Sequence, residues 1–132
     1  DSFHVVFHKD HPLASDKCGL QLAELASYPI VQLARSSSVR QPLEAAIYPN
    51  RMQTVLELEQ LSSVAAMVRE GLGISIIPTL TLFYFKDKEL RTRPLLEPGL
   101  KRQVFLLRSA DRQLSSAAQT LYDLLMANKP LS

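Results

Sequence analysis

The chain has 132 residues, of which 46% are hydrophobic and 21% are charged, and its formal net charge at pH 7 is +2. This length and composition fit one globular domain with its own core and argue against disorder. The charge is too small for a nucleic-acid-binding face, the single Cys18 excludes an internal disulfide framework, and no apolar run reaches the roughly 18 to 20 residues of a membrane helix.

The first part of the chain predicts two strands and a short helix. Residues 3–7 combine aromatic and β-branched side chains, which is typical of a strand. The chain starts at Asp1, directly before this strand and without methionine, so we interpret it as a piece of a longer protein. Pro12 favours a loop after the strand. A short helix over residues 19–26 and a second strand over residues 28–34 follow.

A polar break at residues 35–38 separates the second predicted strand from a helix. That helix carries apolar side chains at helical spacing, at Leu43, Ala46 and Ile47. Residues 52–59 then alternate in polarity, which predicts a third strand.

Residues 57–78 give the most specific local pattern, a helix followed by a buried strand. The helix has one apolar face, formed by Leu61, Val64, Ala65 and Val68. Ser62 or Ser63 is its predicted N-cap, and Gly71 is its predicted C-cap because glycine enters the left-handed conformation at no steric cost. The mostly β-branched run 74–77 predicts a strand covered on both faces.

The last part of the chain is more varied. Residues 79–85 fit neither period, and we expect a short helix or an irregular apolar segment. Two further strands are predicted at residues 90–96 and 103–108, with a turn between them at residues 97–101. Residues 115–128 predict an amphipathic helix. The alternation of strands and helices predicts an α/β fold with a doubly wound, mostly parallel sheet flanked by helices.

Patterns for a metal site or a nucleophile are weak. His4, His8 and His11 lie close together in sequence, but on a strand His4 and His8 are roughly 13 Å apart, too far for one ion. There is no Gly-x-Ser-x-Gly motif, and no basic cluster or helix N-terminus is aimed at Cys18. We therefore expect no metal and no catalytic nucleophile.

Acid–base and cofactor motifs are equally weak. Glu57 and Glu59 point to the same face of a strand, but carboxylates at a strand end are usually solvated rather than catalytic. Gly71 and Gly73 do not complete a Gly-x-Gly-x-x-Gly motif and precede their strand instead of following it. We expect no cofactor.

The polar break after the second strand has the chemistry of an anion site, formed by Arg35, Ser36, Ser37, Ser38 and Arg40. Ligands of open α/β sheets bind beyond the carboxyl ends of strands, and a helix N-terminus there offers free N–H groups. Serine hydroxyls add donors, and an arginine fork binds two oxygens of a carboxylate or phosphate. A serine-rich turn that merely caps the helix is the alternative explanation.

Several stretches also form a pattern that extends over essentially the whole chain. They are the strand and His-Pro-Leu-Ala corner of residues 3–14, Leu-Ala-Glu-Leu at 22–25, Tyr-Pro-Ile at 28–30 and the helix–strand unit at 64–78. Arg102 and residues 112–118 continue the pattern. Together they resemble the effector-binding domain of LysR-type transcriptional regulators.

This resemblance implies a Rossmann-like lobe of a type 2 periplasmic-binding-protein-like domain. Residues 1–110 would form the second lobe, and residues 111–132 a closing helix that packs on a first lobe absent from this chain. The resemblance places effector contacts at residues 36–38 and near Pro78 and Thr79.

The function implied is that of a non-catalytic sensor in a cytoplasmic bacterial regulator. A small, anionic effector would bind between lobes and shift their conformational equilibrium. DNA would be contacted only through an attached helix-turn-helix, and the resemblance implies a homo-oligomer, a dimer or a tetramer, without membrane contact. A periplasmic solute-binding protein or transporter component is the alternative, and an enzyme on the same scaffold lacks any candidate catalytic group.

Overall fold

The structure, a computed structural model, describes residues 1–15 and 19–129. Its elements in chain order are β1 (Phe3–His8), η1 (Pro12–Ala14), α1 (Leu22–Leu25), β2 (Pro29–Leu33), α2 (Arg40–Ile47), β3 (Gln53–Leu58), α3 (Leu61–Arg69), β4 (Ser75–Pro78), η2 (Thr79–Phe85), β5 (Leu90–Pro94) and α4 (Ser116–Ala127). The chain divides into two compact units, Asp1–Arg102 and Gln103–Ser132. No helix among the described residues is long and apolar enough to span a bilayer.

The strands of the first unit form two ladders joined by a bridge. β1 pairs antiparallel with β4 and with β5, while β2 pairs parallel with β3. A parallel bridge between Ile30 and Ile74 links β2 to the start of β4. It rests on hydrogen bonds from the Val31 N–H to the Ile74 carbonyl (2.8 Å) and from the Ile74 N–H to the Pro29 carbonyl (3.0 Å).

The predicted α/β fold is confirmed, with one strand running against the predicted direction. β2, β3, β4 and β5 share one direction, and β1 runs opposite to them between β4 and β5. The order of elements along the chain does not reveal the direction of β1. Its two partners, β4 and β5, come late in the first unit, and several elements separate them from β1 in sequence.

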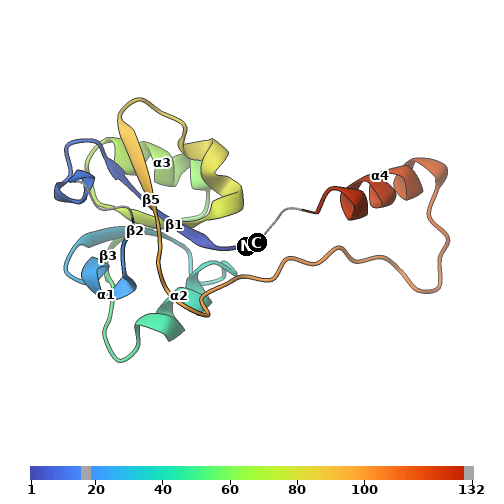
Figure 1. Ribbon diagram of the computed structural model, residues 1–132, viewed down its shortest axis with the longest axis horizontal. Helices are drawn as coiled ribbons and strands as arrows, with labels where there is room; N and C mark the ends of the chain where they lie inside the picture. The colour runs from blue at the N-terminus through green and yellow to red at the C-terminus, as the bar shows by residue number, and fades with distance from the viewer. Residues whose placement is uncertain (16–18, 130–132) are drawn as a thin grey trace. The chain divides into compact units, whose positions relative to one another are not determined.

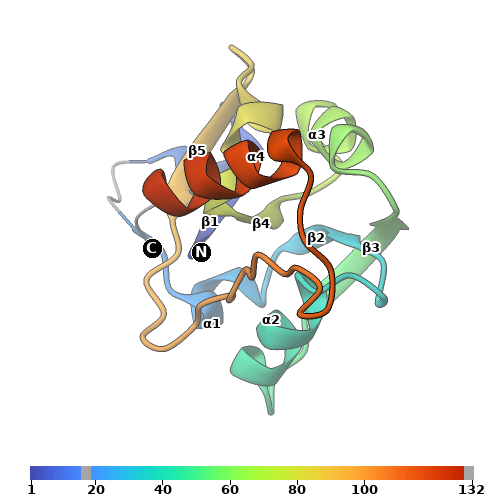
Figure 2. The same ribbon diagram turned by 90° about the vertical axis from the view of Figure 1, so that its right-hand side faces the viewer.

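Helices cover both faces of the strands and create two cores. Figure 1 and Figure 2 show α1 and α2 on one side of the strands and α3 on the other. Consecutive residues of each central strand enter opposite cores: Val5 and Val6, Ile30 and Val31, Ile76 and Ile77. All four residues of β4 are buried, which confirms the prediction of a strand covered on both faces.

Two local predictions were wrong. Residues 103–108 form no strand: their apolar side chains are exposed, with Leu107 at 84%, and no strand of the described chain pairs with them. An extended segment without a ladder partner is not stable as a strand. The N-cap of α3 is Gln60, because the helix already begins at Leu61 and the Val64 N–H donates to the Gln60 carbonyl (3.1 Å).

The predicted helix over residues 19–26 is also shorter than expected. Leu20 forms a parallel bridge with Leu95, so the helix begins only at Leu22. A capping box between Gln21 and Glu24 closes its first turn. At the other end of the chain, the Ser115 hydroxyl caps α4 by accepting from the Ala118 N–H (3.2 Å).

The corner between α3 and β4 needs two glycines for different reasons. Gly71 has φ +82°, and the Leu72 N–H donates to the Met67 carbonyl (3.2 Å), which is the Schellman end of a helix. Nothing lies within 4 Å of where a Cβ of Gly71 would stand. At Gly73 a Cβ would meet the Pro29 carbonyl oxygen at 2.6 Å, so close approach of two backbones excludes a side chain there.

These two glycines predict different mutational costs. Gly71→Ala should destabilise the chain by about 1 kcal/mol, because only the left-handed backbone opposes it, and Gly71→Asn should cost less. Gly73→Ala should cost about 2 kcal/mol or more, because the backbone of β2 has to move. Urea unfolding midpoints of the three variants test this order. Equal midpoints for Gly71→Ala and Gly73→Ala would contradict it.

Candidate functional site

A pocket of about 290 Å³ lies where three parallel strands of the first unit end. Ser37 and Ser38 follow β2, Gln60 follows β3, and Pro78 is the last residue of β4. The carboxyl ends of parallel strands meet at one edge of a sheet, which is where α/β proteins bind ligands. Further polar lining comes from Ser62, Thr81, Tyr84 and Arg102 and from one carboxylate, that of Glu59.

The serine turn after β2 lines this pocket and also shapes the start of α2. The Ser37 hydroxyl accepts from the Val39 N–H (3.2 Å), and the Ser37 carbonyl accepts from the Arg40 N–H (3.2 Å). The hydroxyl of Ser38 faces Arg102, whose Nη1 lies 3.4 Å from it. Ser36 is exposed and does not line the pocket. Ser37 thus does what a capping turn requires and at the same time borders the pocket.

The strand exit after β4 divides between pocket and scaffold. Pro78 lines the pocket, and its carbonyl accepts from the Thr81 hydroxyl (2.7 Å). The Thr79 hydroxyl is instead engaged by Ser2 Oγ and by His4 Nδ1, each at 2.9 Å. Burial lowers the pKa of His4, so a neutral ring accompanies this contact at neutral pH. Thr79 therefore ties β4 to β1 and does not line the pocket.

Arg40 lies away from the pocket, buried behind two half-exposed carboxylates, those of Glu44 and Glu57. Its side chain is 5% exposed; Nε donates to Glu44 Oε1 (2.8 Å), and Nη1 lies 2.6 Å from Glu57 Oε1 as an ion pair without hydrogen-bond alignment. Burial opposes its charge, but the two carboxylates outweigh burial and raise the pKa of Arg40. Its fork joins α2 to β3 and is not free for a ligand.

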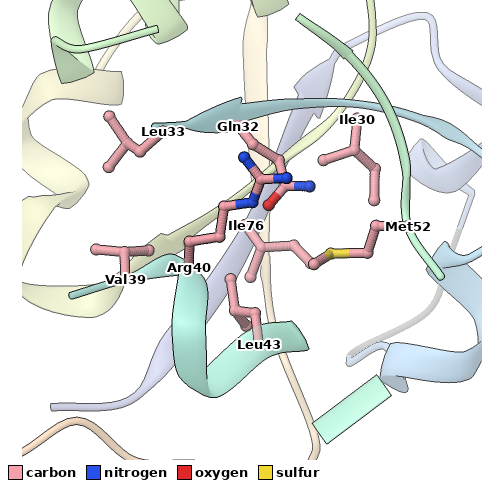
Figure 3. Close-up of a pocket in the computed structure, with 8 residues that line it drawn as sticks. All are labelled: Ile30, Gln32, Leu33, Val39, Arg40, Leu43, Met52 and Ile76. Carbon is pink, nitrogen blue, oxygen red and sulfur yellow. The ribbon is translucent and has the colours of Figure 1, made fainter. Parts of the chain in front are cut away.

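The interior beside Arg40 is packed and offers no ligand site. Figure 3 shows the ends of Arg40 and Gln32 turned toward each other among apolar side chains. The cavity there is about 10 Å³, barely room for one water molecule. Arg35 borders a separate, wide hollow of about 790 Å³ together with Arg40 and Glu57. The structure therefore separates Arg35 and Arg40 from Ser37 and Ser38.

Arg102 was missed as a site residue by residue patterns. It lies 64 positions after Ser38, and nothing in its neighbourhood in sequence marks it as a pocket residue. Only the return of the chain past β5 brings it to the serine turn. The histidines considered in the sequence analysis contact other parts of the scaffold. His8 Nε2 lies 3.5 Å from Glu89 Oε2, and His11 Nδ1 accepts from the Leu13 N–H (3.0 Å). Cys18 lies outside the described residues.

The Arg40 cluster predicts a specific pH dependence of stability. The Arg40 guanidinium, in contact with the Glu57 carboxylate, lowers the pKa of Glu57 in the folded chain. That stabilisation is complete above the usual glutamate pKa of about 4.3 and is lost as pH falls through the lower folded value. Glu57→Gln should therefore be less stable than the unchanged chain at pH 7, and the difference should shrink in acid.

Unfolding midpoints at several pH values measure this effect. Glu59→Gln is the matched control, because Glu59 lies two residues after Glu57, directly behind the end of β3, and is exposed. A Glu57→Gln deficit that stays constant down to pH 3 would show that the carboxylate charge is not the cause.

The comparisons with known proteins agree with this geometry. Residues 1–129 match the family described as LysR substrate binding domain. The uncharacterized HTH-type transcriptional regulator YbhD of Escherichia coli (strain K12) is 30% identical over 128 residues, which cover 96% of this chain and 40% of YbhD. The HTH-type transcriptional activator CmpR of Synechocystis sp. is 28% identical over 127 residues, 94% of this chain and 41% of CmpR.

Solved structures show the same fold. The regulatory domain of Synechocystis PCC6803 CcmR in complex with 2-PG has a TM-score of 0.79 at 26% identity, covering 96% of this chain and 62% of that one. The effector binding domain of QuiR in complex with shikimate has a TM-score of 0.78 at 20% identity, covering 96% and 60%. The chain thus spans about two fifths of its curated relatives. By its family match and its fold, the chain belongs to the LysR substrate-binding domains.

Proposed function

We propose that this chain is the ligand-sensing part of a LysR-type transcriptional regulator and that it binds a small organic anion without transforming it. The observation that carries the proposal is the 290 Å³ pocket at the strand ends, which combines several hydroxyl groups with the Arg102 guanidinium and has the Glu59 carboxylate as its one acidic side chain among the described residues. Hydroxyls and an arginine are the groups that bind carboxylates and phosphates. The two solved relatives bind shikimate and 2-PG, both small anions with hydroxyl or phosphate oxygens.

Within the predicted site, we propose direct effector contacts for Ser37, Ser38 and Pro78. These three line the pocket. Arg40 and Thr79 act as scaffold, because both have committed partners inside the fold. Arg35 and Ser36 stand outside the lining, so their part is the shape of the turn.

We further propose that the two compact units belong to different halves of the complete sensor. The unit Asp1–Arg102 would be the second lobe, and Gln103–Ser132 would carry the closing helix that packs on a first lobe, which moves the proposed boundary from residue 110 to Arg102. The second unit exposes large apolar side chains, including Phe105 at 71% and Leu121 at 57%. Such surfaces mark places that another part of a protein covers.

Signalling would then follow from lobe closure. An effector that binds the closed arrangement more tightly shifts the population toward it, and a helix-turn-helix attached to the same chain reads the change. We propose that the complete regulator is a cytoplasmic homo-oligomer and contacts DNA only through that attached domain. The relative CmpR is a transcriptional activator, which supports a regulatory role over a periplasmic solute-binding protein or an enzyme.

Effector binding by the serine turn can be tested with a panel of anions. Isothermal titration of the full-length protein with shikimate, 2-phosphoglycolate and inorganic phosphate should detect binding of at least one. Ser37→Ala and Ser38→Ala should each weaken that binding by roughly 1 kcal/mol, the size of one lost hydrogen bond. Ser63→Ala is the matched control, because Ser63 is exposed on α3 and does not line the pocket.

Two outcomes would count against the proposal. Absence of binding for all three anions would contradict an anion sensor. Unchanged affinity in both serine variants would remove the turn from the site, provided that the melting temperatures show both variants to be folded.

A further inference from the structure

Arg102 is the last residue of the first compact unit, and its backbone pairs with that of Asp1. The Asp1 nitrogen donates to the Arg102 carbonyl at 2.8 Å, and the Arg102 N–H donates to the Asp1 carbonyl at 2.8 Å. The second unit begins at Gln103, the next residue. The backbone of Arg102 is therefore held in place by two hydrogen bonds directly before the connection to the second unit.

The Arg102 side chain is fixed on one side by a buried carboxylate. Its Nη2 donates to Asp1 Oδ2 at 2.9 Å, and the Asp1 side chain is 1% exposed. The other carboxylate oxygen, Oδ1, accepts from the Leu80 N–H at 3.1 Å. Both carboxylate oxygens of Asp1 are thus engaged, and Asp1 holds the guanidinium in one orientation. Only the Nη2 group of Arg102 donates to this carboxylate among the described contacts.

The remaining donors of Arg102 are poorly used. Nη1 has one long contact, to Ser38 Oγ at 3.4 Å, at the edge of the pocket. Nε is buried and donates to no acceptor among the described residues. A guanidinium carries five N–H donors, and buried donors without an acceptor are uncommon in native proteins. The guanidinium therefore has unused hydrogen-bonding capacity beside the pocket.

Charge leads to the same residue. Among the described residues that line this pocket, Arg102 is the one with a positively charged side chain. Arg40, a more deeply buried arginine of the same unit, has carboxylates from two elements on its fork. Arg102 has one carboxylate partner, Asp1, and its Nη1 lies 3.4 Å from the Ser38 hydroxyl; the Glu59 carboxylate lines the same pocket without forming an ion pair with it among the described residues.

We propose that Arg102 is the residue that recognises the charged group of the effector, with its Nη1 edge directed at a carboxylate or phosphate held beside Ser38. The inference rests on the proposed function and adds to it the residue that selects for an anion. Recognition of this kind makes binding depend on the ligand charge and not only on its shape.

The test compares a charged ligand with a neutral analogue of nearly the same shape. In the full-length protein, Arg102→Gln should weaken binding of shikimate on the order of tenfold to a hundredfold and leave the weaker binding of shikimate methyl ester unchanged. Arg102→Lys should fall between, because it keeps the charge and loses the planar fork. Arg91→Gln is the control: it removes one positive charge from β5, where the Arg91 guanidinium donates to the Lys88 and Leu90 carbonyls and Arg91 does not line the pocket.

A second measurement uses the unchanged protein. It applies also where the bound anion is not shikimate or where an Arg102 variant is destabilised. Titration of the same three anions into the unchanged protein should shift the Nε–H resonance of Arg102, identified by its loss in Arg102→Lys. Equal losses for shikimate and its ester, or an unshifted Arg102 resonance while signals of the serine turn move, would overturn the inference and leave the proposed function intact. Failure of all three anions to bind the unchanged protein would overturn both.

Discussion

The short contact between β2 and β4 is the constraint on which the pocket depends. Two backbone hydrogen bonds at the Ile30–Ile74 bridge join the β2–β3 ladder to the β4–β1–β5 ladder. The pocket takes residues from both, since Ser37 and Ser38 follow β2 while Pro78 ends β4. Gly73 permits this contact, because any side chain there would strike the Pro29 carbonyl. A glycine far from the serine turn in sequence thus decides whether the strand ends can meet.

Two arginines in the same unit have opposite roles because their surroundings differ. Arg40 is enclosed by Glu44 and Glu57, and in a buried site such compensation fixes two elements to each other. Arg102 has one carboxylate partner, a long contact to a hydroxyl and a buried N–H without an acceptor. Nη1 of Arg40 also lacks an aligned hydrogen bond, but it has a carboxylate oxygen 2.6 Å away, whereas Nε of Arg102 has no acceptor among the described residues. The sequence placed Arg40 in the anion site because it is an arginine close behind the serines. Residue type and spacing cannot tell which arginine the fold provides with carboxylate partners.

The sequence predicted best where local physics decides the structure. The periodicity of α3, the β-branched run of β4 and the left-handed Gly71 all depend on near neighbours in the chain, and the structure agrees with them. Predictions failed where a distant partner decides. Residues 103–108 have strand composition but no pairing strand in the described chain. Arg102 reaches the pocket only through its pairing with Asp1, 101 positions away, which no spacing rule encodes.

The position of Arg102 also bears on how binding could be transmitted. Its side chain borders the pocket, its backbone pairs with Asp1, and Gln103 begins the second compact unit. An anion that binds the Arg102 guanidinium and restricts its motion would therefore act on the residue from which the chain leaves the first unit. A free-energy difference between two arrangements of the connection is all that a population shift needs. In this proposal recognition and transmission share one residue, whereas the serine turn, which lies between β2 and α2 within the first unit, would contribute affinity without such a link.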